Sequence, residues 1–221
     1  LLAAATLAFI DFPPLPLPSA ARPGRPLAEI ARQPVFIVAV IGCALGYGVM
    51  NLLMAATPIA MAQCSHPFSS AALVLEWHVL GMFVPSFFTG TLIKRFGALP
   101  VMAFGVLLNA LCIAVALSGV ELMRFLLALF ALGLGWNFLF IGGTTLFTEA
   151  YRPEERTGAQ ATMDTVIMAT MTLTSLGSGA LVTTQGWTWL NLGSIVPVAL
   201  TAVALAWLAV VRRRAAALPA A

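Results

Sequence analysis

The chain has 221 residues, of which 61% are hydrophobic and only 9% are charged, with a formal net charge of +3. A soluble domain carries about 25% charged residues, so this composition excludes an ordinary soluble domain. The basic residues form no tract that would follow nucleic-acid phosphates, and the three cysteines show no metal-ligand or disulfide spacing. Several apolar runs reach the roughly 20 residues that cross a bilayer, which predicts a polytopic membrane protein without metal or cofactor.

The first part of the chain is predicted to lie outside the main bundle. Residues 1–11 are apolar and carry no basic leader or cleavage site, so they are expected to be the end of a transmembrane helix whose beginning is missing. Residues 12–34 are rich in proline, which removes backbone donors and favours an extended chain. They are predicted to form an exposed linker with a short helix at 27–32.

Six apolar runs follow the linker. Only helices fit, because an open strand edge would leave backbone groups unpaired in lipid. The predicted fold class is therefore all-α, an integral membrane bundle of six transmembrane helices over residues 35–211, with a tail at 212–221. Three prolines within or near the runs are expected to permit kinks, namely Pro58, Pro85 and Pro197. The predicted spans are Val35–Thr57, Ala71–Ile93, Ala98–Ser118, Phe125–Thr148, Ala161–Thr183 and Trp187–Val211.

The basic residues divide unevenly between the two sides of the bundle. Ten of the eleven fall in the linker, the 94–97 turn, the 151–160 loop and the tail, and only Arg124 falls on the other side. Cytoplasmic loops carry an excess of Lys and Arg, so the linker and the C-terminus are predicted to be cytoplasmic.

Two loops on the arginine-rich side carry candidate gating residues. At the end of the second span, Gly90 permits close helix approach, Arg95 offers a donor to a carboxylate, and Gly97 suits a helix cap. The simpler interpretation is a basic anchor followed by a helix stop. The loop after the fourth span offers charged partners for Arg95, namely Glu149, Arg152 and Arg156.

With these glycines and Arg95, and with the run GWNFLFIGGTTLFTEAYRPEER, the chain resembles the major facilitator superfamily of secondary transporters. The loop motif of that family has Asp where this chain has Lys94, and basic residues where it has Ala98 and Leu99. The resemblance implies that residues 35–211 form the C-terminal six-helix half of a twelve-helix carrier. The N-terminal half would then be missing.

The function implied by the resemblance is secondary active transport of a small organic solute by alternating access, coupled to an ion, with the proton as the expected one. The implied partners are the solute, the bilayer of a bacterial inner membrane and the N-terminal half, with no nucleic acid. In such carriers the first, second, fourth and fifth helices of this half approach the cavity, and the third and sixth face mostly lipid. The alternatives are an integral membrane enzyme, or a sensor or structural protein that transports nothing.

Two helical faces carry candidate solute-binding residues. Tyr47 and Asn51 are four residues apart on the first span, Asn137 and Phe140 are three apart on the fourth, and Trp136 is adjacent. A buried amide in lipid either bonds a neighbouring helix or meets a polar solute, and both interpretations stay open. The aromatic neighbours suit a planar or amphipathic solute.

Three ionisable residues lie within spans. Glu76 and His78 are coupling candidates, and about 200° of helical rotation separates them, so one is expected to face the cavity while the other bonds a helix. Glu76 either exchanges a proton or serves as a structural or solute-contacting polar group. Asp164, near the start of the fifth span, is either an acid favoured by the helix dipole or, by family analogy, a gate partner of the missing half.

Overall fold

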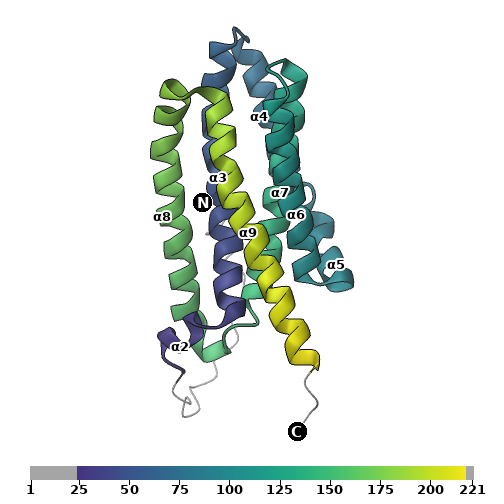
Figure 1. The fold of residues 1–221 in the computed structure, drawn as a ribbon, viewed down its shortest axis with the longest axis vertical. Helices are drawn as coiled ribbons and strands as arrows, with labels where there is room; N and C mark the ends of the chain where they lie inside the picture. Colours follow the sequence, from purple (N-terminus) through teal and green to yellow (C-terminus); the bar gives the residue numbers. More distant parts are fainter. Residues whose placement is uncertain (1–23, 218–221) are drawn as a thin grey trace, which may run out of the picture.

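The structure is a computed structural model that describes residues 24–217, and this part of the chain is helical throughout its regular elements, with no strand (Figure 1). The predicted span at 1–11, the first part of the linker and the last four residues of the tail lie outside the described residues. The elements are α2 (Leu27–Ala31), α3 (Pro34–Gln63), α4 (Phe68–Phe83), α5 (Ser86–Phe96), α6 (Ala98–Leu117), α7 (Leu122–Phe147), the 3-10 turn η1 (Pro153–Glu155), α8 (Arg156–Thr184) and α9 (Gly186–Ala217).

Up to six membrane spans are present among these helices. Five of them, α3, α6, α7, α8 and α9, are each long and apolar enough to cross a bilayer. The pair α4 and α5, which is bent by 40°, has the length and composition of a sixth, broken span. The all-α prediction is confirmed, and the short helix predicted in the linker is α2.

The centre of the bundle is formed by α3 and α7. Helix α7 packs against α3, α4 and α6, and α3 packs in addition against α8 and α9. Burial agrees with this arrangement. In the most apolar stretch of each helix, 67% is buried in α7 but only 17% in α8. Figure 1 shows α8 at one edge of the bundle beside α3. Helix α8 therefore presents most of its surface outward.

Glycines let α7 approach its neighbours closely. A Cβ on Gly133 would collide with the backbone carbonyl oxygen of His78 and lie 3.0 Å from the amide nitrogen of Met82, both on α4. On the other flank, a Cβ on Gly105 of α6 would lie 2.9 Å from the carbonyl oxygen of Gly135. Small residues at helix crossings are the usual means of close packing in lipid, where the hydrophobic effect between helices is weak.

The second span is interrupted at one of the three prolines that were expected to permit kinks. It is broken after Phe83, and α5 begins at Ser86. The cause is Pro85, which lacks an N–H and clashes with the carbonyl one turn earlier, so the helix changes direction there. The other two prolines do not break their helices: α3 continues through Pro58 and α9 through Pro197.

Three helices extend beyond their predicted ends. Helix α3 continues to Gln63, α8 begins five residues before the predicted start, and α9 runs through the arginines of the predicted tail to Ala217. Ala, Arg and Gln are good helix formers and let a helix continue past the hydrocarbon region. The early start puts Asp164 in the third turn of α8, so its interpretation as a first-turn acid is wrong. It is exposed and accepts a hydrogen bond from Gln160 at 3.0 Å.

We expect Gly133→Ala to destabilise the full-length protein, because the new methyl group must push α4 and α7 apart. Overpacking of this kind costs about 1–3 kcal/mol, which thermal unfolding in detergent would register as a Tm lower by several degrees. Gly179→Ala on α8 is the matched control, since no atom of residues 24–217 lies within 4 Å of its new Cβ. Equal Tm values for the two variants would contradict the close crossing.

Candidate functional site

Four aromatic side chains from three helices form one group in the bundle, which we call the aromatic cluster: Tyr47 of α3, Phe83 of α4, and Trp136 and Phe140 of α7. The rings of Trp136 and Phe140 stack with centroids 5.1 Å apart and an interplanar angle of 9°. Tyr47 meets them edge-on, at 5.3 Å from Trp136 and 5.6 Å from Phe140. Phe83 lies 6.3 Å from Trp136. Both geometries are the favoured ones for aromatic pairs.

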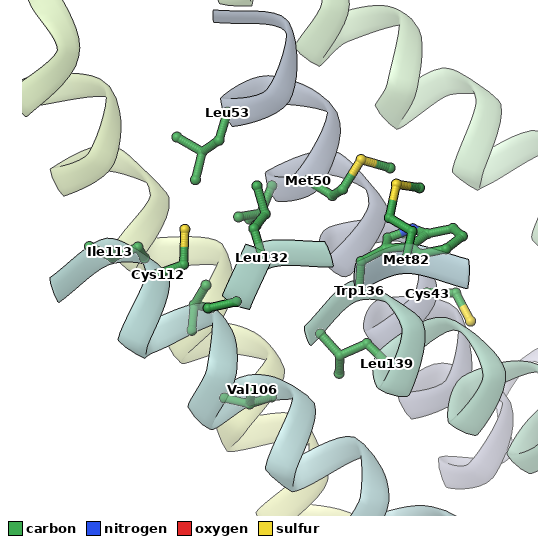
Figure 2. Close-up of a cluster of buried hydrophobic side chains, with 14 of the residues drawn as sticks. Cys43, Met50, Leu53, Met82, Val106, Cys112, Ile113, Leu132, Trp136 and Leu139 are labelled. Carbon is green, nitrogen blue, oxygen red and sulfur yellow. The ribbon is translucent and has the colours of Figure 1, made fainter. Parts of the chain in front are cut away.

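The aromatic cluster runs from the bundle interior to its surface. Trp136 is 6% exposed, Tyr47 and Phe140 are half-buried, and Phe83 is 58% exposed. Figure 2 shows Trp136 among buried side chains that include Met50, Met82 and Leu139. The indole Nε1–H of Trp136 finds no acceptor among residues 24–217, so the cluster holds an unused donor.

The three predicted aromatic residues are therefore brought together, and Phe83 was missed by sequence reasoning. The available signal was spacing, because Phe83 lies seven residues after Glu76 on the same face of the second span. The second span contains several aromatic residues, and the bend between α4 and α5 decides that Phe83 is the one that joins the cluster.

Asn51 and Asn137 form hydrogen bonds to different helices. Asn51 is one turn beyond Tyr47 on α3, and its Nδ2 donates to the carbonyl of Met171 at 3.1 Å and to Oγ1 of Thr174 at 3.0 Å, both on α8. No hydrogen bond to its Oδ1 is formed by the described residues. Asn51 thus joins α3 to α8 and keeps an acceptor available.

Asn137 is fully buried at the bend of the second span. Its Nδ2 donates to the carbonyl of Met82 and to Oγ of Ser86, each at 2.7 Å, and its Oδ1 lies 2.7 Å from the hydroxyl of Thr89. The carbonyls at the end of a helix have no partner in the next turn, and in lipid they need one. Asn137 supplies that partner for Met82, so its hydrogen-bonding groups are used inside the bundle.

Glu76 and His78 occupy different environments, as their spacing predicted. Glu76 is exposed in a shallow apolar depression with Leu75, Val79 and Leu80 of α4. His78 is fully buried, and its Nδ1 lies 2.7 Å from the carbonyl oxygen of Leu129 on α7. Because a carbonyl only accepts, Nδ1 carries the proton, and Nε2 has no partner within residues 24–217.

The ionic contacts at the arginine-rich end differ from the expected ones. Arg95 forms no ion pair within the described part of the chain, and its guanidinium lies over the ring of Phe96 at 5.2 Å from the centroid. Glu149 instead pairs with Arg212, with 2.6 Å between Oε2 and Nη2. The predicted pairing of Arg95 with the 149–156 loop is wrong because the long helix α9 brings its own arginine to Glu149.

The remaining gate candidates lie at the surface. Gly97 adopts a φ of +89°, which side-chain-bearing residues rarely adopt, in agreement with its predicted role as a cap. Apart from its own turn of helix, Gly90 has no described atom within 4 Å of the place a Cβ would occupy, so no close helix approach is made there within residues 24–217. The side chains of Arg152 and Arg156 are exposed.

The strongest ionic contact involves Glu155, which is not among the candidates from the sequence. Its side chain is 1% exposed and accepts four hydrogen bonds from Arg25 and Arg152. Arg25 contributes its backbone N–H and two guanidinium nitrogens at 2.8–2.9 Å, and the hydrogen bond to Glu155 raises the pKa of its guanidinium. Gln33 and Arg25 both donate to the carbonyl of Ala150. These bonds fasten the linker to the loop between α7 and α8.

The long apolar helices, together with the polar and aromatic side chains buried between them, show that this is a polytopic membrane protein. The sequence profile of the Major Facilitator Superfamily matches residues 38–221. The chain belongs to the Major Facilitator Superfamily.

Three curated relatives are similar to the chain. It is 44% identical over 168 residues to the riboflavin transporter RfnT of Brucella anthropi, covering 76% of this chain and 42% of that protein. It is 31% identical over 150 residues to the uncharacterized MFS-type transporter YddS of Bacillus subtilis, covering 67% of this chain and 34% of the relative. The transporter YdeG of the same organism is 36% identical over 54% of this chain and 28% of its own length.

The chain spans less than half the length of these curated relatives. No solved structure matches the chain.

We expect Glu155→Gln to loosen the linker. Both carboxylate oxygens of Glu155 accept hydrogen bonds, whereas a glutamine amide has only one acceptor oxygen, and its NH₂ group would face the N–H groups of Arg25 or Arg152. Hydrogen bonds to charged groups are among the stronger ones, so exchange of these two backbone amides should accelerate by about tenfold in hydrogen–deuterium exchange. Glu154→Gln is the control, since Glu154 is exposed and makes no hydrogen bond within residues 24–217. Unchanged exchange in the Glu155 variant would show that the contact does not hold the linker.

Proposed function

We propose that the chain is the C-terminal half of a secondary active transporter that moves a planar, riboflavin-like solute across a bacterial inner membrane by alternating access. Residues 24–34 belong to the linker from the N-terminal half, and the linker and C-terminus face the cytoplasm. Support comes from the family, from the ten-to-one division of basic residues and from the similarity to a riboflavin transporter. The observation that carries the solute class is the aromatic cluster.

The aromatic cluster suits a flat heteroaromatic solute. Tyr47, Phe83 and Phe140 are at least partly exposed, so they offer ring surface to a flat solute beside the buried Trp136. A flavin-like ring carries several carbonyl and nitrogen acceptors as well as an N–H donor. The free Oδ1 of Asn51 would accept from that donor, and the buried indole N–H of Trp136 would reach a solute acceptor only when the cluster opens. Asn137 supports the site by holding the bend rather than by meeting the solute.

Loss of ring contacts should weaken binding of riboflavin to the full-length transporter. We expect Tyr47→Leu and Phe140→Leu each to raise the Kd by up to about tenfold, because aromatic pairs contribute about 0.5–1.5 kcal/mol beyond their buried area. Quenching of riboflavin fluorescence on binding to the purified protein would measure this. Trp189→Leu is the control, since Trp189 is exposed on α9 and makes no ring contact with the cluster. Equal Kd values for all three variants would contradict the assignment.

The second part of the proposal concerns the driving force. Glu76 is the coupling candidate because it is an exposed carboxylate on a membrane-crossing helix, where an ionisable residue is expensive to keep without a function. It lies two turns from Phe83 on the same face of α4, so a proton on Glu76 and a solute at the cluster would be neighbours. His78 is tied to α7 and acts as a fixed polar support of this helix pair.

We expect Glu76→Gln to keep riboflavin exchange and to lose uphill uptake driven by a proton gradient, because Gln preserves shape but binds no proton. Counterflow and pH-driven uptake in proteoliposomes separate the two activities. Glu121→Gln is the control, since Glu121 is exposed in the turn before α7 and, within residues 24–217, pairs with Arg124 alone. Uphill uptake equal to that of the parent would place the coupling site elsewhere.

The gate is the third part of the proposal. The surface residues Gly90, Arg95, Gly97, Arg152, Arg156 and Asp164 are the candidates for contacts with the N-terminal half. All of them lie at the arginine-rich end of the bundle. Because Asp164 is held only by Gln160 and Arg95 has no carboxylate partner within residues 24–217, both charges are available to a facing loop. Contacts of this kind at span ends can form in one state of a carrier and break in another.

A further inference from the structure

Two apolar grooves flank the beginning of α6. The first, of about 410 Å³, lies between α6 and α9 and is lined by residues such as Ala103, Leu107, Ala206 and Ala209. The second, of about 250 Å³, lies between α5, α6 and α7 and is lined by residues such as Leu92, Phe96 and Phe104. Pro100 lines both grooves, so they meet at the first turn of α6. Every lining side chain in either groove is apolar.

An arginine lies close in the chain to the lining residues of each groove. Arg213 lies four residues after Ala209 and seven after Ala206, so it continues the groove-lining face of α9 toward the arginine-rich end. Arg95 lies with its guanidinium over Phe96, a wall of the second groove. Both arginines are exposed, and neither forms an ion pair within residues 24–217. Figure 1 shows α5 and the C-terminal part of α9 in the same lower half of the bundle.

We propose that this surface binds one anionic phospholipid, with its two acyl chains in the two grooves on either side of Pro100 and its headgroup phosphate between Arg95 and Arg213. Adjacent grooves that share a wall match the two chains of a single lipid, and both grooves are open at the surface of residues 24–217. Basic residues at the cytoplasmic end of a pocket between transmembrane helices favour anionic headgroups over zwitterionic ones. The arginine head suits a phosphate oxygen through paired N–H donors.

A second protein surface fits this region less well. A partner helix would need a continuous apolar face, whereas here two grooves are separated by the first turn of α6 and end at unpaired arginines. A soluble phosphate compound would use the arginines but leave both grooves empty. Two apolar grooves with cations at one end are complementary to an amphiphile that has two chains and an anionic head.

The test is native mass spectrometry of the purified full-length protein with equimolar phosphatidylglycerol and phosphatidylcholine. The parent should carry one tightly held phosphatidylglycerol in preference to phosphatidylcholine. Arg95→Gln combined with Arg213→Gln should lower phosphatidylglycerol affinity by roughly fivefold for each arginine removed and leave phosphatidylcholine binding unchanged. Ala206→Phe, which fills the first groove, should lower retention of the lipid without any change of charge.

Two controls separate this site from diffuse attraction. Arg156→Gln combined with Arg214→Gln removes the same charge at exposed positions off the grooves, and Val210→Phe adds the same ring at an exposed position that lines neither groove. Both should bind phosphatidylglycerol like the parent. Equal loss in a test variant and its control, or full binding by the Arg95 and Arg213 double variant, overturns the proposal. Displacement of the lipid by glycerol 3-phosphate, which has no acyl chains, overturns it in favour of a soluble phosphate site.

Discussion

The requirement that every backbone polar group in the membrane find a partner inside the protein governs this structure. An unbroken helix satisfies this requirement with its own backbone hydrogen bonds. The second span is broken at Pro85, which leaves carbonyl groups at the end of α4 without partners in the next turn. Asn137 resolves the break, because one amide donates to Met82 and Ser86 and accepts at Thr89. The position of α5, and with it the arginine-rich end of that span, depends on this contact between α4, α5 and α7.

The same helix pair sets the position of the candidate solute site. Gly133 allows α7 to touch the backbone of α4, and the bond from His78 to the carbonyl of Leu129 adds a polar contact one turn away. Close contact on that flank fixes Trp136 and Phe140 on the part of α7 that faces α3 and Tyr47. A rigid aromatic cluster is useful to a carrier, because rings already held in place lose little conformational entropy when a flat solute stacks on them.

The charges at the arginine-rich end divide into two groups. Arg25 and Arg212 are paired with Glu155 and Glu149, and these contacts fasten the linker and α9 to the loop between α7 and α8. Arg95 and Arg213 are left without carboxylate partners in the described part of the chain. Basic residues that look alike in the sequence thus differ in their contacts: the first pair is held by carboxylates, and the second has no carboxylate partner within residues 24–217.

The sequence alone determined the class, the number of crossings, the arginine-rich side and the presence of an aromatic and polar interior, because hydrophobic length and charge position are local properties that lipid constrains strongly. It also placed Glu76 and His78 on different faces, which follows from helical rotation alone. Tertiary structure decided the partners. It showed that Asn137 serves a bend, that Phe83 joins the aromatic cluster, that Arg212 rather than Arg95 meets Glu149, and that Glu155 is buried against the linker. These outcomes depend on where the helices end and where they cross. The packing of side chains that are far apart in the sequence decides both.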